Sequence, residues 1–199
     1  MEYADKPVVV LAIPNGGVPV GLEVASAINA DFDVIICRKI PLPLRPEGGF
    51  GAIADDGTIV LNQVMVKQAG LTEDQIEYEA NRVRTEVKQR SLLYRGNRPL
   101  TMLTNKTVIL VDDGLASGIT MTAAVESVRR KRPRQLVVAV PAASAVAAEH
   151  IQKVADKLVT CAVGSTQKFY IADYYRLWRD ISDIEIMQFL KQWQTRNLP

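Results

Sequence analysis

Short apolar runs separated by helical patterns constrain the fold of this chain more than any other feature. Four runs are rich in β-branched residues, and a weaker fifth follows: Pro7–Ile13, Asp33–Cys37, Thr107–Val111, Gln135–Val140 and Leu158–Val163. Each is nearly continuous in hydrophobicity, as expected of strands covered on both faces. Helical patterns lie between most of them, over Gly16–Ala30, Ile119–Lys131 and Ser144–Ala155. This alternation predicts an α/β domain with a mostly parallel sheet.

Two segments interrupt the alternation. Residues 38–62 are rich in proline and glycine and predict a long, flexible loop, within which Ala52–Val60 carries a hairpin signal. A loop of this length in a small domain is usually functional or mobile. The second segment, Leu71–Arg95, predicts a helix with a capping box formed by Thr72 and Gln75, and we interpret this helix as structural.

Composition excludes several classes of function. Lys and Arg number 24 against 22 acids, so net charge favours neither nucleic acid nor a membrane as partner. No apolar run approaches the roughly 20 residues that span a bilayer, and the first residues do not resemble a signal peptide, so we expect a cytoplasmic protein. Cys37 and Cys161 lie in apolar runs and are expected to be buried. With His150 as the single histidine, a His/Cys zinc cluster is excluded.

The segment Thr107–Met121 carries the chemistry. Its apolar strand ends in Asp112 and Asp113, and a loop of small residues leads into a helix near Gly118. Such a loop presents backbone N–H groups and the positive end of the helix dipole to an anion. Gly118 permits close approach of the backbone, and the hydroxyls of Ser117 and Thr120 add donors. Because carboxylates accept from hydroxyls, a vicinal diol beside a phosphate, as in ribose 5-phosphate, fits both halves of the segment.

Other interpretations of the acid pair exist. Asp112 and Asp113 could merely cap a helix in a generic α/β protein. A phosphatase or receiver domain also places an acid after a strand, but neither needs a Ser-Gly-x-Thr phosphate turn. No Gly-x4-Gly-Lys-[Ser/Thr] sequence occurs, which excludes a P-loop nucleotidase.

The run Val111–Met121 resembles the signature with which type I phosphoribosyltransferases bind 5-phosphoribosyl-1-pyrophosphate (PRPP). The resemblance to one little-characterised branch of that family extends over Leu11–Gly21, Arg38–Ile53, Tyr94–Arg98, Val108–Thr122 and Phe169–Asp183. It implies one domain over residues 1–199, with a five-stranded parallel core and a small hood contributed by about residues 165–199. It also implies dependence on Mg²⁺, a homodimer, and transfer of phosphoribosyl to a nitrogenous acceptor.

The same resemblance assigns roles to individual residues. Asp112 and Asp113 would hold the ribose hydroxyls, contact Mg²⁺ through water and take part in catalysis. The loop residues would surround PRPP as a continuous set: Asp112, Asp113, Gly114, Leu115, Ala116, Ser117, Gly118, Ile119 and Thr120. Asn15, Gly16 and Gly17 would contact pyrophosphate, and we expect glycine there because a donor loop close to pyrophosphate leaves no room for Cβ atoms.

Arg38 and Lys39 are a further catalytic candidate pair. They would neutralise the leaving pyrophosphate while their loop closes over the site, with Lys39 also binding that group. The alternative is an ordinary basic surface loop. Related sequences commonly have Arg in place of Asn15, which weakens the case for leaving-group binding. Ala116 stands where the 6-oxopurine branch has Asp, so hypoxanthine and guanine are poorer candidates than other bases.

Three further features have two interpretations each. The aromatic-rich stretch near the end of the chain either stacks a flat base or plugs the hood; its residues are Phe169, Tyr170, Tyr174, Tyr175 and Trp178. Within it, Phe169 and Tyr170 are the candidates for binding the base. His150 fits a surface position better than a catalytic one. The basic run Arg129–Arg134 fits a helix end better than an RNA-binding surface, because no aromatic residues interleave it.

The sequence therefore predicts an Mg²⁺-dependent phosphoribosyltransferase. The alternative is a PRPP-binding regulatory module without turnover, because a fold does not fix a function. RNA-coupled regulation through Arg129–Arg134 is a weaker third possibility, which salt-dependent RNA binding would support.

Overall fold

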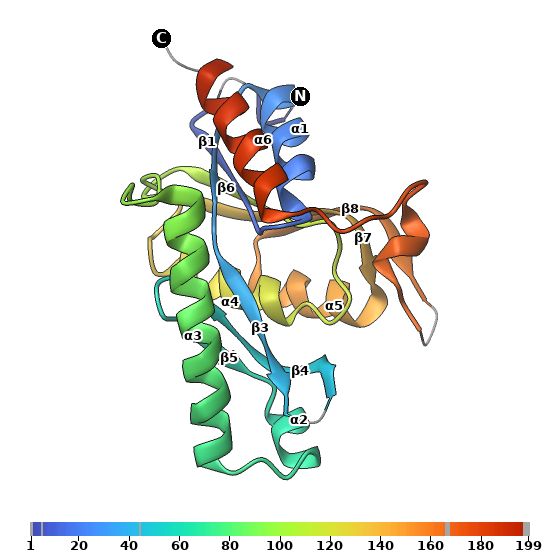
Figure 1. Cartoon of the computed structure of the whole chain (residues 1–199). Coiled ribbons are helices and arrows are strands. Elements are labelled where there is room, and N and C mark those ends of the chain that lie inside the picture. The colour runs from blue at the N-terminus through green and yellow to red at the C-terminus, as the bar shows by residue number, and fades with distance from the viewer. Residues whose placement is uncertain (1, 5, 44, 166–167, 197–199) are drawn as a thin grey trace.

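The computed structural model describes residues 2–4, 6–43, 45–165 and 168–196, and a five-stranded sheet lies at its centre (Figure 1). The strand order is β2-β1-β6-β7-β8, and every neighbouring pair is parallel. The strands are β1 (Val8–Ala12), β2 (Asp31–Val34), β6 (Thr107–Val111), β7 (Gln135–Ser144) and β8 (Lys157–Gly164). Four of the five apolar runs supply one strand each, and the run Asp33–Cys37 spans the end of β2 and the start of the next strand. The parallel sheet confirms the predicted α/β class and parallel core.

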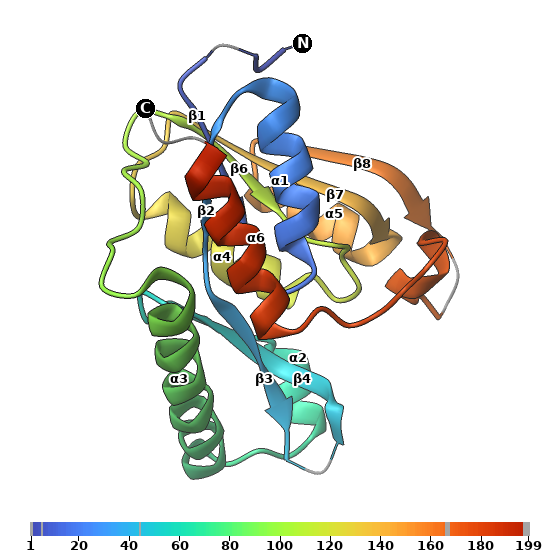
Figure 2. The same ribbon diagram turned by 45° about the horizontal axis from the view of Figure 1, so that its top comes forward.

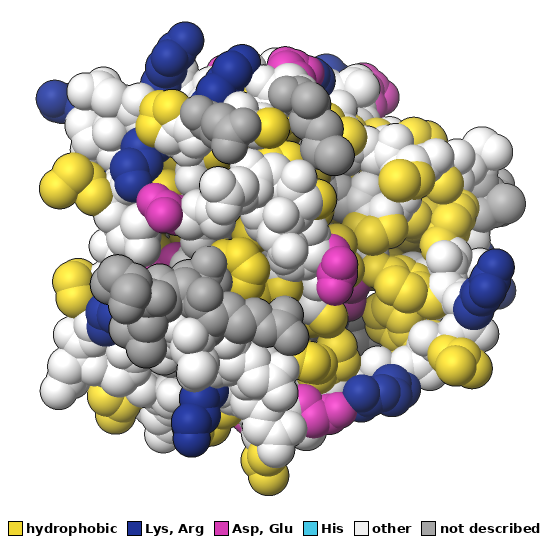
Figure 3. Space-filling model, turned by 90° about the horizontal axis from the view of Figure 1, so that it is seen from above, with side chains coloured by type: hydrophobic (Ala, Val, Ile, Leu, Met, Phe, Trp, Pro, Cys, Tyr) yellow, Lys and Arg dark blue, Asp and Glu magenta, His cyan; other side chains and the backbone are white. Residues whose placement is uncertain are grey.

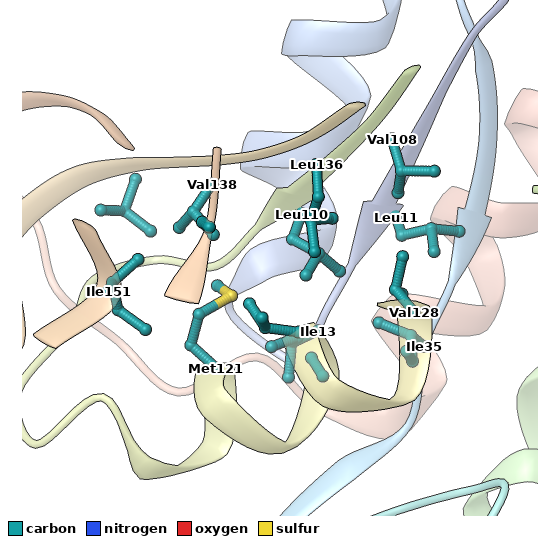
Figure 4. Packing of buried hydrophobic residues seen from close by; sticks show 14 of the residues in the cluster. Leu11, Ile13, Ile35, Val108, Leu110, Met121, Val128, Leu136, Val138 and Ile151 are labelled. Carbon is teal, nitrogen blue, oxygen red and sulfur yellow. The ribbon is translucent and has the colours of Figure 1, made fainter. Parts of the chain in front are cut away.

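Helices cover both faces of this sheet. They are α1 (Gly17–Ile28) and α6 (Asp183–Arg196) on one face, and α4 (Ile119–Arg129) and α5 (Ala145–Val154) on the other. Figure 2 shows the two layers on either side of the strands. The packing is dense beneath the sheet, where Leu110, Leu136 and Val138 face Met121 of α4 and Ile151 of α5 (Figure 4). Because both faces are covered, a ligand can reach the sheet only at the strand ends.

Residues 38–62 do not form the long loop that we expected. Most of them belong to a small antiparallel sheet of β3 (Cys37–Leu42), β4 (Arg45–Ala54) and β5 (Ile59–Leu61). The hairpin between β4 and β5 is confirmed, with Ile53 opposite Ile59. The many glycines were interpreted as a sign of a loop, but here they allow neighbouring strands to approach closely. A Cβ on Gly51 would lie 2.6 Å from the Val60 carbonyl oxygen.

A short helix, α2 (Gln63–Gln68), leads from the small sheet to the long helix α3 (Glu73–Arg95). The capping box of Thr72 and Gln75 is present. At its other end, α3 places Arg95 in a buried ion pair with Asp55 of the hairpin turn. A buried carboxylate needs such a partner, so this pair fixes α3 against the small sheet.

The C-terminal segment divides into two parts. Residues 168–182 include the 3-10 helix η1 (Ile171–Tyr174) and pass the carboxyl ends of the central strands, as the right side of Figure 2 shows. Helix α6 then returns to α1, where Ile186 is buried and the rings of Phe32 and Trp193 lie 5.6 Å apart. The hood expected over about residues 165–199 stays a prediction, although α6 packs against α1 and the central sheet.

Two smaller expectations have mixed outcomes. Cys37 is buried as expected, but Cys161 is exposed, because β8 lies at the edge of the sheet. Among the described residues, no helix is both long enough and apolar enough to cross a membrane.

Candidate active site

The acid pair lies at the carboxyl end of β6, in the middle of the sheet. The side chain of Asp112 accepts a hydrogen bond from the backbone N–H of Asp113 over 2.9 Å. Burial raises the pKa of Asp112 well above its usual range, and the neighbouring carboxylate of Asp113 raises it further. Burial also raises the pKa of Asp113. Two carboxyls held together in this way attract donors such as hydroxyls.

The loop after the acid pair is fixed to β7 by its backbone. Leu115 donates to the carbonyl of Ala142 over 2.9 Å and accepts from Ser144 over 2.8 Å. The hydroxyl of Ser144 donates to the carbonyl of Ala116 over 2.7 Å. Gly118 caps α4 with φ at 74°, a left-handed conformation that favours glycine. Residues 112–118 and Thr120 line a cavity of about 170 Å³, which is suited to a phosphate at the start of a helix.

The loop Asn15–Gly17 approaches the acid pair from the end of β1. A Cβ on Gly16 would lie 1.8 Å from Oδ2 of Asp113, and one on Gly17 would lie 2.9 Å from Cα of Asp112. Glycine is therefore required by the acid pair, and not only by a ligand as we had expected. Within the described chain, the backbone N–H groups of Asn15 and Gly16 have no hydrogen-bond partner, so both can serve an anion.

Arg38 and Lys39 lie on β3 rather than on a loop. With Asn15, Gly16, the acid pair and Thr120 they line a second cavity of about 580 Å³. Nε of Arg38 lies 2.9 Å from a carboxylate oxygen of Glu86 on α3. The structure thus brings the three predicted segments, after β1, on β3 and after β6, to one place.

A third cavity of about 500 Å³ adjoins Asp113 on the side of the C-terminal segment. The aromatic residues Tyr175 and Trp178 line it, with ring centroids 5.1 Å apart in an edge-on arrangement. The phenol of Tyr175 donates to the backbone carbonyl of Asp113 over 2.8 Å. Burial raises the pKa of Tyr175 to about 12, so the phenol remains a donor at neutral pH. In Figure 3 hydrophobic side chains gather on the right of the view, beside a hollow with acidic side chains at its edge.

The expected stacking residues lie elsewhere. The ring of Phe169 packs against Tyr174 at 5.1 Å, and Tyr170 is 59% exposed. Neither residue is among the described residues that line the three cavities. The binding of a base by Phe169 and Tyr170 stays a prediction, and the geometry favours Tyr175 and Trp178 for that role.

The sequence analysis assigned no role in the site to Arg90 or to Tyr94, because α3 was interpreted as structural, although Tyr94 begins one of the segments of the family resemblance. Arg90 lines the third cavity and donates to the side-chain oxygen of Asn15 over 2.9 Å. The hydroxyl of Tyr94 donates to Asp183 over 2.5 Å. No local motif marks Arg90, although the i, i+4 spacing of Glu86 and Arg90 is a weak signal of their pairing.

For His150 and the basic run, the structure fits the interpretation without a role in the site. His150 is exposed on α5, although its Nε2 lies 3.1 Å from the hydroxyl of Thr122. The basic run begins where α4 ends, and Arg129 pairs with Asp156. Among the described residues, no group of three or more His, Cys, Asp or Glu side chains could hold a metal ion.

Comparison with known proteins assigns the chain to a family. Residues 52–174 match the phosphoribosyl transferase domain family, and the chain belongs to that family. Proteins of two Mycobacterium tuberculosis strains that carry the provisional name phosphoribosyl transferase are 34% identical over 189 residues. The match covers 95% of this chain and 42% of theirs, so the chain spans about two fifths of the length of these curated relatives.

One solved structure shows the same fold over nearly the whole chain. The protein TT1426 from Thermus thermophilus is 34% identical, with a TM-score of 0.76 over 96% of this chain and 89% of that chain. A purine phosphoribosyltransferase from Pyrococcus horikoshii is more distant. Its identity is 16% and its TM-score 0.43, over 78% of this chain and 71% of that one.

Proposed function

We propose that this chain binds PRPP across the three adjoining cavities and transfers its phosphoribosyl group to a nitrogenous acceptor, releasing pyrophosphate. The observation that carries the proposal is the meeting of Asp112 and Asp113 with the Gly118 loop on one side and the loop of Asn15 and Gly16 on the other. A diol acceptor lies between two anion-binding loops, as PRPP requires.

The ribose 5-phosphate half fits the smallest cavity. Its phosphate would accept hydrogen bonds from backbone N–H groups of residues 116–120 and from the hydroxyls of Ser117 and Thr120. The ribose hydroxyls would donate to Asp112 and Asp113. This arrangement leaves the anomeric carbon near Asp113, where the second and third cavities meet.

The pyrophosphate half fits the second cavity. The backbone of Asn15 and Gly16 supplies donors, and Arg38 and Lys39 supply positive charge. Charge of this kind stabilises the negative charge that develops on a departing pyrophosphate, without new covalent chemistry by the protein. Glu86 competes with the ligand for Arg38, so we expect that ion pair to open when pyrophosphate binds.

The acceptor fits the third cavity, where its nitrogen would attack the anomeric carbon. Tyr175 and Trp178 give this cavity an aromatic wall that suits a flat heterocycle. The protein contributes chiefly position and charge, because two ligands held in adjoining cavities react as though in one molecule.

Mg²⁺ is part of this proposal as a cofactor. Asp112 and Asp113 form one pair of adjacent carboxyls at the site, and among the described residues no third metal-ligating side chain is grouped with them. That donor set fits an ion held mainly by PRPP oxygens and water, with Asp112 and Asp113 acting through water. Bound Mg²⁺ would neutralise part of the charge on pyrophosphate.

The test is release of pyrophosphate from PRPP and Mg²⁺ in the presence of pooled purines, pyrimidines and small metabolites. Release that depends on one component supports the transferase and identifies the acceptor by subtraction. The double variant Asp112→Asn, Asp113→Asn should lose PRPP affinity, whereas Asp31→Asn, a surface variant at the far end of the sheet, should not. Unchanged affinity in the double variant would refute the site. PRPP binding without release would favour the regulatory module.

A further inference from the structure

Four side chains from distant parts of the sequence meet beside the loop after β1. They are Asn15, Arg90 and Tyr94 of α3, and Asp183 at the start of α6. One oxygen of Asp183 accepts from Asn15 over 2.9 Å, from Arg90 over 3.1 Å and from Tyr94 over 2.5 Å. The hydrogen bond from Tyr94 lowers the pKa of Asp183 most, so this carboxylate is charged at neutral pH.

The amide of Asn15 is fully used by these contacts. Its nitrogen donates to the backbone carbonyl of Ile181 over 2.7 Å and to Asp183. Its oxygen accepts from Arg90 over 2.9 Å. An amide has two N–H donors, and both are engaged, so the side chain cannot donate to a ligand without breaking an existing bond. Its role in this state is to hold the loop.

The hydrogen bonds from Asn15 to Ile181 and Asp183 form a link between two different parts of the site. Asn15 adjoins Gly16, whose backbone borders Asp113 and the second cavity. Ile181 and Asp183 end the segment that carries Tyr175 and Trp178, the aromatic wall of the third cavity. The contacts therefore join the side of the site proposed for pyrophosphate to the side proposed for the acceptor.

We propose that Asp183 is a positioning residue. Together with Arg90 and Tyr94 it holds the side chain of Asn15, and this fixes the loop at residues 15–17 against the C-terminal wall of the acceptor cavity. The inference rests on the proposed function, which supplies the two ligands. A rearrangement on either side would then be felt on the other, because the link is a continuous network of hydrogen bonds.

Whether Asp183→Ala binds pyrophosphate more weakly or more tightly than the wild type separates a positioning role from a purely electrostatic one. A carboxylate near an anion site repels the anion, and this one also occupies Arg90. If charge alone mattered, Asp183→Ala would bind pyrophosphate more tightly than the wild type. If Asp183 positions the loop, the same variant binds more weakly, by roughly fivefold. Asp183→Asn keeps an acceptor oxygen and should stay within about twofold of the wild type.

The experiment is calorimetric titration of the full chain with pyrophosphate and Mg²⁺. Asp180→Ala is the matched control, since it removes a carboxylate three residues from Asp183, at the wall of the third cavity, that has no bond to Asn15 in the described structure. This variant should bind pyrophosphate at least as tightly as the wild type. Weaker binding by Asp183→Ala, without weaker binding by Asp180→Ala, supports the inference. Equal or tighter binding, or an equal loss in both variants, overturns it.

A second measurement does not depend on turnover or on Asp183→Ala folding. Asn15→Ala cuts the link from the other end, and hydrogen exchange in residues 175–183 should then become faster in the ligand-free protein. Unchanged exchange would overturn the inference. A wild type that binds neither pyrophosphate nor PRPP would instead refute the proposed function, and the exchange result would still decide whether the link exists.

Discussion

Tyr175 donates a hydrogen bond from its phenol to the backbone carbonyl of Asp113 over 2.8 Å. This bond connects the C-terminal segment to the acid pair at the centre of the site. Ile171 supports the same connection, since a Cβ on Gly114 would lie 2.9 Å from its side chain. The wall of the proposed acceptor cavity is thus positioned directly on the loop that would hold the ribose.

Tyr175→Phe tests this connection. The variant keeps the ring but loses the hydrogen bond, which contributes about 1 kcal/mol. We expect KM for the acceptor to rise about fivefold, with little change in PRPP binding. The control is Tyr174→Phe, because Tyr174 packs against Phe169 outside the cavities. An equal loss of PRPP and acceptor affinity would show that Tyr175 supports the whole loop instead.

The acid pair predicts how stability changes with pH. Because the folded state raises the pKa of Asp112, it binds that proton more tightly than the unfolded chain, where the usual value is 3.8. The pair therefore favours folding below the usual value, and this contribution is lost as pH rises through the raised pKa. Asp112→Asn avoids the loss.

We expect Asp112→Asn to melt roughly 2–4 °C above the wild type near neutral pH, corresponding to about 1 kcal/mol. The difference should shrink as pH falls towards about 4. The measurement is thermal unfolding of both proteins in a chelating buffer, so that metal does not contribute. A difference that is constant with pH would show that ionisation of the pair is not its cause.

Gly16→Ala should damage the site without removing any functional group. The new methyl would lie where the Asp113 carboxylate now lies, so one of the two must move. Overpacking of this kind typically costs about 1–3 kcal/mol. We expect weaker PRPP binding together with a lower melting temperature, measured by titration and by thermal unfolding. Wild-type affinity would mean that the loop and the acid pair can separate freely.

Much of this architecture could be predicted from the sequence because it depends on local signals. Continuous apolar runs indicated the strands of the parallel sheet, and the capping box of Thr72 and Gln75 marked the start of α3. The acid pair and Gly118 also lie within one short segment, so one motif could carry them. Where strand, loop and helix follow one another directly in the chain, a local motif is enough to predict how their residues are arranged.

The remainder depends on contacts between distant segments. The glycines of β4 indicated a loop, and only the pairing with β3 and β5 shows why small residues are needed there. Arg90 and Asp183 are 93 positions apart and carry no shared pattern. Tyr175 and Phe169 were equivalent as aromatic residues until the chain path placed one against Asp113 and the other against Tyr174.

Lys39→Ala tests whether β3 takes part in the chemistry. Lys39 lines the second cavity, and its aliphatic stem lies over Gly49, where a Cβ would come within 2.4 Å of it. A cation placed at the departing pyrophosphate acts mostly in the transition state, so kcat should fall about tenfold or more while the dissociation constant of PRPP changes little. Lys67→Ala on α2 removes the same charge away from the cavities and should leave kcat unchanged. Pre-steady-state measurement of pyrophosphate release, beside equilibrium binding of PRPP, separates the two effects. A parallel loss in both would assign Lys39 to binding alone.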